Sequence, residues 1–228
     1  MMKKNGFTLA EVLITLAIIG VVATLTLPAL MTNTGEQQYV TGLKKGINTL
    51  TEAAQMNEVI LGFNYATLSD ESDVTKDGEQ SLFGLLANRA NVDFTKTDNG
   101  TKHNAKMHTR SDNYTVFFRD GAALIFPKNA TSTTTNGKQK NDKIMDDGLV
   151  YGIPVIYDVN GLKAPNTLSN CGANPKSALL STSNVDDEGE ADVCNNKVNR
   201  VIRDQFGVRL RGSFAIPNGA AAKWAFGQ

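Results

Sequence analysis

An uncharged apolar segment near the amino terminus constrains this 228-residue chain more than any other feature. Residues 12–31 read VLITLAIIGVVATLTLPALM, and their only polar side chains are three threonines. A helix of this length is about 30 Å long, at about 1.5 Å per residue, and matches the hydrocarbon thickness of a bilayer. The sequence therefore predicts a transmembrane helix over residues 7–31.

The residues before this segment orient the helix. The opening stretch MMKKNG carries Lys3 and Lys4 and no acidic residue, and basic residues beside a membrane helix favour the cytoplasmic side. We therefore expect a single pass with the amino terminus in the cytoplasm and everything after Met31 outside. A secretory signal peptide is the simplest alternative, but its apolar region runs for about 7 to 15 residues, which is shorter than this segment.

A carboxylate, Glu11, lies inside the apolar stretch that begins at Phe7. An unpaired ionised side chain in a membrane helix costs up to about 3 kcal/mol on insertion scales, and such a residue is by default functional and needs a cationic partner. A simple export signal gains nothing from this charge. The alternative is an acid that is merely tolerated close to the membrane surface.

The residues around Glu11 resemble a known family. The stretch KKNGFTLAEVLI at residues 3–14 is similar to the amino terminus of type IV pilins and of the pseudopilins of type II secretion. The resemblance implies that prepilin peptidase removes a leader peptide, residues 1–6, by cutting after Gly6. It also implies methylation of the new amino terminus at Phe7, and it places Glu11 fifth after the cut, where the family carries a glutamate.

Cleavage would supply the partner that Glu11 lacks, because it creates a cationic α-amino group at Phe7. Within one helix the two groups are poorly placed to meet, but staggered subunits would bring the amine of one chain to the carboxylate of its neighbour. In a low dielectric such a pair fixes register. Glu11 is therefore expected to act in subunit assembly, and the expected partners are prepilin peptidase, other pilin or pseudopilin subunits and the inner membrane.

Gly20 and Pro28 also stand where the family often has these residues, and the match weakens after Pro28. Proline lacks an amide hydrogen, so the helix loses its bond to the carbonyl of Thr24 and is expected to kink there. A helix end at the membrane surface is an equally good interpretation, because TNTG follows at 32–35.

An amphipathic helix is expected to continue the chain as a stem over residues 32–62. Between residues 36 and 61, apolar side chains recur at helical spacing among charged ones. They are Val40, Leu43, Ile47, Leu50, Ala54 and Leu61. Gly35, Gly42 and Gly46 each cost a helix about 1 kcal/mol relative to alanine, so the first half of this stem is expected to be its weakest part.

Residues 63–228 are expected to form a globular head of short helices and strands. Ser81 can cap a short helix that runs to Ala90. Two β-rich runs, 114–118 and 122–126, flank an Asp-Gly pair, which is a strong hairpin signal.

Further strands are expected in the second half of the head. The stretch 128–143 contains one alanine and no larger apolar residue, which predicts an exposed polar loop. A strand is expected over 149–157, with Pro154 at an edge or a bulge, and a last long strand over 209–216. A long helix followed by antiparallel strands predicts an α+β fold, and the resemblance implies the pilin-like form of it, a helix packed on a small antiparallel sheet.

A turn rich in side-chain oxygens is expected at residues 158–166, DVNGLKAPN. Asp158 and Asn160 could offer oxygens to Ca²⁺, and some pseudopilins bind calcium. A full calcium site needs about six to eight oxygens, so a turn closed by its own backbone is the preferred interpretation. In several pilin-like proteins such a stretch is followed by an Asp-x-Phe segment, and residues 204–206 resemble it after an insertion at 167–199.

Cys171 and Cys194 lie in the part of the chain that is expected outside the cytoplasm, where thiols are oxidised. A disulfide that closes the insertion is the simple expectation. A catalytic thiol is the rival interpretation, but no histidine is near either cysteine in sequence. His103 and His108 lie in a polar stretch without cysteines or paired acids and are expected at the surface rather than at a metal.

Charge is separated locally in the head, with an acidic run at 186–192 and basic residues between 197 and 211. Such runs are usually solvated faces. A contact with a subunit or a substrate is the alternative.

Charge balance and motifs narrow the function. The chain has 23 Lys and Arg against 23 Asp and Glu, which disfavours nucleic acid as a partner. It has no Gly-x-Ser-x-Gly, His-Glu-x-x-His or P-loop sequence, so neither an enzyme nor a small-molecule substrate is expected.

The leading hypothesis is a structural subunit of a type IV pilus-like filament or a type II secretion pseudopilus. Two alternatives stay open: a minor pilin whose head binds or adheres, and a membrane-anchored exported enzyme.

Overall fold

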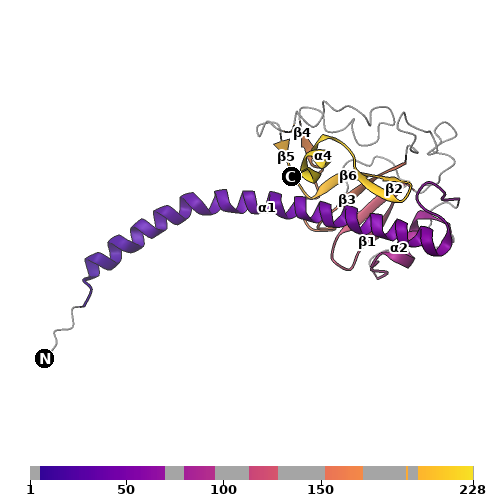
Figure 1. The fold of residues 1–228 in the computed structure, drawn as a ribbon. Coiled ribbons are helices and arrows are strands. Elements are labelled where there is room, and N and C mark those ends of the chain that lie inside the picture. The colour runs from indigo at the N-terminus through magenta and orange to yellow at the C-terminus, as the bar shows by residue number, and fades with distance from the viewer. Residues whose placement is uncertain are drawn as a thin grey trace. The chain divides into compact units, whose positions relative to one another are not determined.

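The computed structural model describes residues 6–69, 80–95, 113–127, 152–171, 194 and 200–227, without the side chains of residues 28–33, 113 and 127. Three helices and seven strands lie in these ranges (Figure 1). The helices are α1 (Leu9–Leu61), α2 (Leu82–Arg89) and α4 (Ala220–Phe226). The strands are β1 (Asn113–Phe117), β2 (Ala123–Pro127), β3 (Ile153–Asp158), β4 (Asn170–Cys171), β5 (Arg200–Val201), β6 (Gln205–Arg211) and β7 (Phe214–Pro217).

The strands form two antiparallel sheets. Strands β1, β2, β3, β6 and β7 lie side by side in that order, and β4 pairs with β5 in a separate sheet. The long amino-terminal helix and the five-stranded antiparallel sheet confirm the expected α+β, pilin-like fold class.

The chain divides into two compact units, Met1–Gln38 and Tyr39–Gln228. In the first unit, Leu9–Leu27 form a stretch of helix that is long and apolar enough to cross a membrane. The helix α1 is continuous through Pro28, so the interpretation in which the helix ends at this proline is wrong. The loss of one amide donor removes a single bond, and the turns on both sides continue the helix; a kink stays a prediction.

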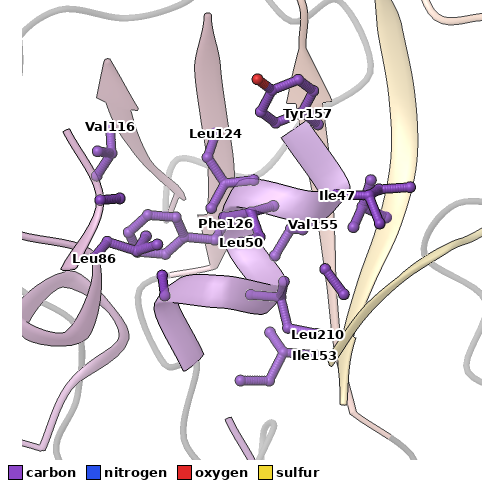
Figure 2. Packing of buried hydrophobic residues seen from close by; sticks show 14 of the residues in the cluster. Ile47, Leu50, Leu86, Val116, Leu124, Phe126, Ile153, Val155, Tyr157 and Leu210 are labelled. Carbon is purple, nitrogen blue, oxygen red and sulfur yellow. The ribbon is translucent and has the colours of Figure 1, made fainter. Parts of the chain in front are cut away.

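In the second unit, the last part of α1 packs an apolar stripe against the five-stranded sheet (Figure 2). The predicted core positions Leu43, Ile47, Leu50 and Ala54 are buried. In the same cluster lie Leu86 of α2 and the sheet side chains Val116, Leu124, Phe126, Ile153, Val155, Tyr157 and Leu210. The prediction is wrong for Leu61, which is 51% exposed, because the chain leaves the helix there and Phe63 is buried instead.

Two glycines allow α1 to approach its neighbours closely. A Cβ on Gly46 would lie 2.3 Å from Cζ of Tyr157, and a Cβ on Gly42 would lie 2.1 Å from Cγ1 of Val159. The sequence predicted that these glycines weaken the stem. In the fold, the two glycines lower the helix propensity of α1, but they also let α1 lie close to β3 and to the turn after β3.

The second helix and the hairpin are confirmed. Oγ of Ser81 accepts a hydrogen bond from the Gly84 amide at 2.9 Å and caps α2. The hairpin of β1 and β2 turns at Asp120 and Gly121, where Gly121 has a φ of 95°. Glycine adopts this backbone conformation without steric cost, which explains why the Asp-Gly signal was reliable.

The predicted strand positions of the second half need two corrections. Pro154 lies in β3, an internal strand with unbroken register against β6, so the prediction of a bulge is wrong. Proline is tolerated because β2 pairs with only Ile156–Asp158 of β3, so the β2 side of β3 is a local edge at Pro154. The predicted single strand 209–216 is the end of β6, a turn and β7. The chain reverses at Gly212, which has a φ of 55°, and the prediction overlooked this Gly-Ser turn signal.

Helix α4 was not predicted. The polar loop at 128–143, the acidic run at 186–192 and the two histidines, His103 and His108, lie outside the described residues. The domain boundaries at residues 6, 31 and 62 stay predictions.

Candidate functional site

Glu11 caps the helix that carries it. Since α1 begins at Leu9, Thr8 is its N-cap residue and Glu11 its third residue. Oε2 of Glu11 accepts hydrogen bonds from the backbone amide and from Oγ1 of Thr8, both at 2.8 Å, and the Glu11 amide donates to Oγ1 of Thr8 at 3.3 Å. This reciprocal arrangement is a capping box, and the helix dipole also stabilises a carboxylate in the first turn.

The prediction for Glu11 did not include this local role, although Thr-x-x-Glu at residues 8–11 is a sequence signature of a capping box. Both bonds end on Oε2, and among the described residues no donor contacts Oε1. The Glu11 side chain is exposed. The helix therefore holds one carboxylate oxygen, while the other is open to a cation from outside the chain.

Beyond this cap, α1 presents apolar side chains on all sides. Every leucine, isoleucine and valine between Leu9 and Leu27 is at least 46% exposed. A helix that is apolar around its whole circumference is normally buried, in a membrane or among other helices. The first unit therefore needs a cover of lipid or of other chains.

The turn after β3 is closed by its first residue. Oδ1 of Asp158 accepts hydrogen bonds from the amides of Asn160 at 3.1 Å and Gly161 at 2.8 Å. Oδ2 of Asp158 accepts a hydrogen bond from Nε2 of Gln205 at 2.9 Å. These bonds form the Asx-type turn that the sequence favoured.

A second acid, Asp204, attaches the same turn to the start of β6. Its Oδ2 and Oδ1 accept hydrogen bonds from the amides of Asn166 at 2.7 Å and Thr167 at 2.9 Å. Both Asp158 and Asp204 are fully buried. The stretches 158–166 and 204–206 are therefore in direct contact.

The residues considered for calcium, Asp158 and Asn160, lie in the turn after β3. Among the described residues, no group of three or more acids, histidines or cysteines is arranged to hold a metal. Oδ1 of Asn160, Oδ1 of Asn166 and Oε1 of Gln205 are buried without a hydrogen-bond partner in this part of the chain, and such oxygens could accept a bond from water or contact a cation. Calcium at Asp158 and Asn160 stays an untested alternative.

The predicted disulfide between Cys171 and Cys194 is confirmed. Arg200 pairs with Cys171 across β4 and β5, and its Nη1 donates to the Cys194 carbonyl at 3.3 Å. The guanidinium carbon also lies 3.9 Å from the centre of the Trp224 ring in α4. The sequence placed Arg200 in a basic run that is usually a solvated face, but Arg200 is half-buried and Arg209 of the same run is buried. The contact between Arg200 and Trp224 was not predicted, because no local pattern relates a strand residue to a helix 24 residues later.

A small cavity lies between α1 and the β1–β2 hairpin, with a volume of about 180 Å³. It is lined by Lys45, Gly46, Thr49, Leu50, Asn91, Phe118, Asp120 and Tyr157. Nζ of Lys45 and Oδ2 of Asp120 form an ion pair at 2.8 Å in this lining. Ligand pockets usually measure about 300–1,000 Å³, so the cavity is small for a ligand.

Comparison with known proteins identifies the amino terminus. Residues 1–27 match the family model of the prokaryotic N-terminal methylation motif, which is characteristic of type IV pilins and pseudopilins. A search of curated proteins and a search of solved structures found no match. The matched segment contains Gly6, Phe7 and Glu11.

Proposed function

We propose that this chain, which carries the N-terminal methylation motif characteristic of type IV pilins and pseudopilins, is the precursor of a structural subunit. The subunit belongs to a type IV pilus-like filament or a type II secretion pseudopilus. Prepilin peptidase cuts the precursor after Gly6 and methylates Phe7, and the mature chain assembles with other subunits through α1.

The observation that carries this proposal is the pairing of an apolar, exposed helical segment, Leu9–Leu27, with a carboxylate in its first turn. Thr8 and Glu11 both follow the proposed cut, so the capping box persists in the mature chain. It holds the Glu11 carboxylate in place, with Oε1 open to the methylated amine of a neighbouring subunit. In the low dielectric between packed helices, this ion pair is strong enough to set the stagger of subunits.

The proposed location follows from the flanks of α1. Lys3 and Lys4 keep the leader in the cytoplasm, and Leu9–Leu27 span the inner membrane until the subunit is extracted into the filament. The head then lies outside the cytoplasm, where a disulfide such as Cys171–Cys194 persists. The methylation motif favours a structural subunit over an enzyme.

Mass spectrometry of the amino terminus of the native protein tests the processing step. We expect a mature chain that begins with N-methylated Phe7. A chain that still begins at Met1, or one cut beyond Met31, contradicts the proposal and supports an unprocessed protein or a secreted one.

Two substitutions of Glu11 separate the ion pair from the helix cap. Glutamine also serves at the third position of a capping box, so Glu11→Gln keeps the bond to Thr8 and removes the charge, whereas Glu11→Ala removes both. Each variant is expressed beside the wild type, with Glu52→Gln as a control at an exposed acid of the same helix.

We expect Glu11→Gln and Glu11→Ala to enter the filament poorly, and Glu52→Gln to enter it normally. If Glu11→Gln assembles normally and Glu11→Ala does not, Glu11 acts only as a helix cap and the ion pair is refuted. If both assemble normally, Glu11 has no part in assembly.

A further inference from the structure

We propose that the Cys171–Cys194 disulfide controls the docking of the carboxyl-terminal helix α4, and that Arg200 connects the two. The helix contacts β4, β6 and β7 in the head, and its Trp224 also contacts Arg200 of β5 (Figure 1). The coupling concerns the exported head and does not depend on filament assembly.

Arg200 is held by residues whose positions depend on the disulfide. The sheet of β4 and β5 consists of two residue pairs, Asn170 with Val201 and Cys171 with Arg200. An isolated two-stranded sheet is marginally stable at best, and this one is linked covalently to Cys194 through Cys171. Since Nη1 of Arg200 donates to the Cys194 carbonyl, the bridge fixes both the strand and the acceptor that orient this guanidinium.

Helix α4 depends on contacts from outside itself. It has seven residues and an N-cap glycine, Gly219, that makes no side-chain capping bond, and isolated helices of this length are not stable in water. Its buried residues, Ala221, Ala222 and Ala225, are all small. Trp224 adds a specific side-chain contact to this packing, because its ring stacks on the Arg200 guanidinium at 3.9 Å as a cation–π contact.

The covalent step is a two-electron reduction by a dithiol. The reductant forms a mixed disulfide with one cysteine and releases the other as a thiolate, and its second thiol then displaces the first cysteine. The products are the reductant's own disulfide and two protonated cysteine thiols. Cys194 is then no longer tied to β4, its carbonyl moves away from Arg200, and Trp224 loses its stacking partner. Oxidation runs the same steps in reverse: a small-molecule or protein disulfide accepts the two electrons and is released as two thiols, and α4 docks.

The experiment uses the fluorescence of Trp224, which is the only tryptophan of the chain. The full chain in mild detergent is compared before and after treatment with dithiothreitol, and amide hydrogen exchange is followed in α4 and in β3 and β6. Arg200→Lys keeps the charge but loses the planar guanidinium. Arg203→Lys is the matched control, because Arg203 is exposed and donates to the carbonyl of Ile202 at 3.2 Å.

Reduction of the wild type is expected to red-shift the Trp224 emission and to speed amide exchange in α4 about tenfold. A tenfold change is what the loss of one partly desolvated cation–π contact would produce. The amides of β3 and β6 keep their protection. Oxidised Arg200→Lys shows the same red shift, and reduction adds nothing to it, while Arg203→Lys behaves as the wild type.

Three results would overturn the proposal. The first is an emission that does not change on reduction. The second is a full response of Arg200→Lys to reduction, which would show that the disulfide acts on α4 without Arg200. The third is a simultaneous loss of protection in α4, β3 and β6, which would show that the disulfide only keeps the whole head folded.

Discussion

Replacing Gly46 by alanine sets helix propensity against packing. Alanine improves the helix by about 1 kcal/mol relative to glycine. The added Cβ, however, would lie 2.3, 2.4 and 2.8 Å from Cζ, Cε1 and Cε2 of Tyr157. Carbon atoms in contact are normally about 3.5–4.0 Å apart, so the Tyr157 ring would have to move by about 1 Å.

The surroundings of Tyr157 decide how much of this clash relaxes. The side chain is 3% exposed and its ring centre lies 6.3 Å from that of Phe118, but the cavity of about 180 Å³ beside Gly46 gives it some room. Overpacking of a core costs about 1–3 kcal/mol. After the gain in propensity, we expect Gly46→Ala to lower the free energy of unfolding by about 1 kcal/mol, or the melting temperature by about 2–4 °C.

Circular dichroism of the full chain in mild detergent measures this loss. Tyr157→Leu provides the control background, because leucine lacks the three ring atoms that clash. In that background Gly46→Ala should raise the free energy of unfolding by about 1 kcal/mol, because only the higher helix propensity of alanine remains. If Gly46→Ala stabilises the otherwise unchanged protein by the same amount, close packing against Tyr157 does not require a glycine at this position.

Three further predictions concern the head. Ser81→Ala removes the cap of α2 and should lower the free energy of unfolding by about 1 kcal/mol in urea titrations; an unchanged midpoint would contradict the capping role. Burial raises the pKa of Tyr65 far above its ordinary value of 10.0, so above pH 10.0 only the unfolded chain releases this proton and stability falls as pH rises. Tyr65→Phe should therefore lose less stability between about pH 9 and pH 11 than the wild type does, and equal losses would count against this account. Since N–H donors already bind both oxygens of Asp158, the melting temperature should be equal in EDTA and in millimolar calcium; a higher value in calcium would instead support the site at Asp158 and Asn160.

Features that depend on neighbours in the chain could be predicted from the sequence. The apolar run that ends at Leu27, the cap at Ser81 and the hairpin at Asp120 and Gly121 each depend on interactions within a few residues, so their signals are local. The same holds for Thr8 and Glu11, whose capping box was readable and was overlooked. The single disulfide was predictable because the chain has only two cysteines.

The remaining features depend on contacts between distant residues, and the tertiary structure alone decides them. From the sequence, Gly46 is expected only to weaken the helix. The fold places the Tyr157 ring against it and so gives it a packing role. Asp204 and Arg200 gain their roles only when β6 lies beside the 158–166 turn and α4 lies beside β5. Helix propensity and turn formation act over a few residues, whereas packing depends on which surfaces the completed chain brings together, and no local pattern contains that information.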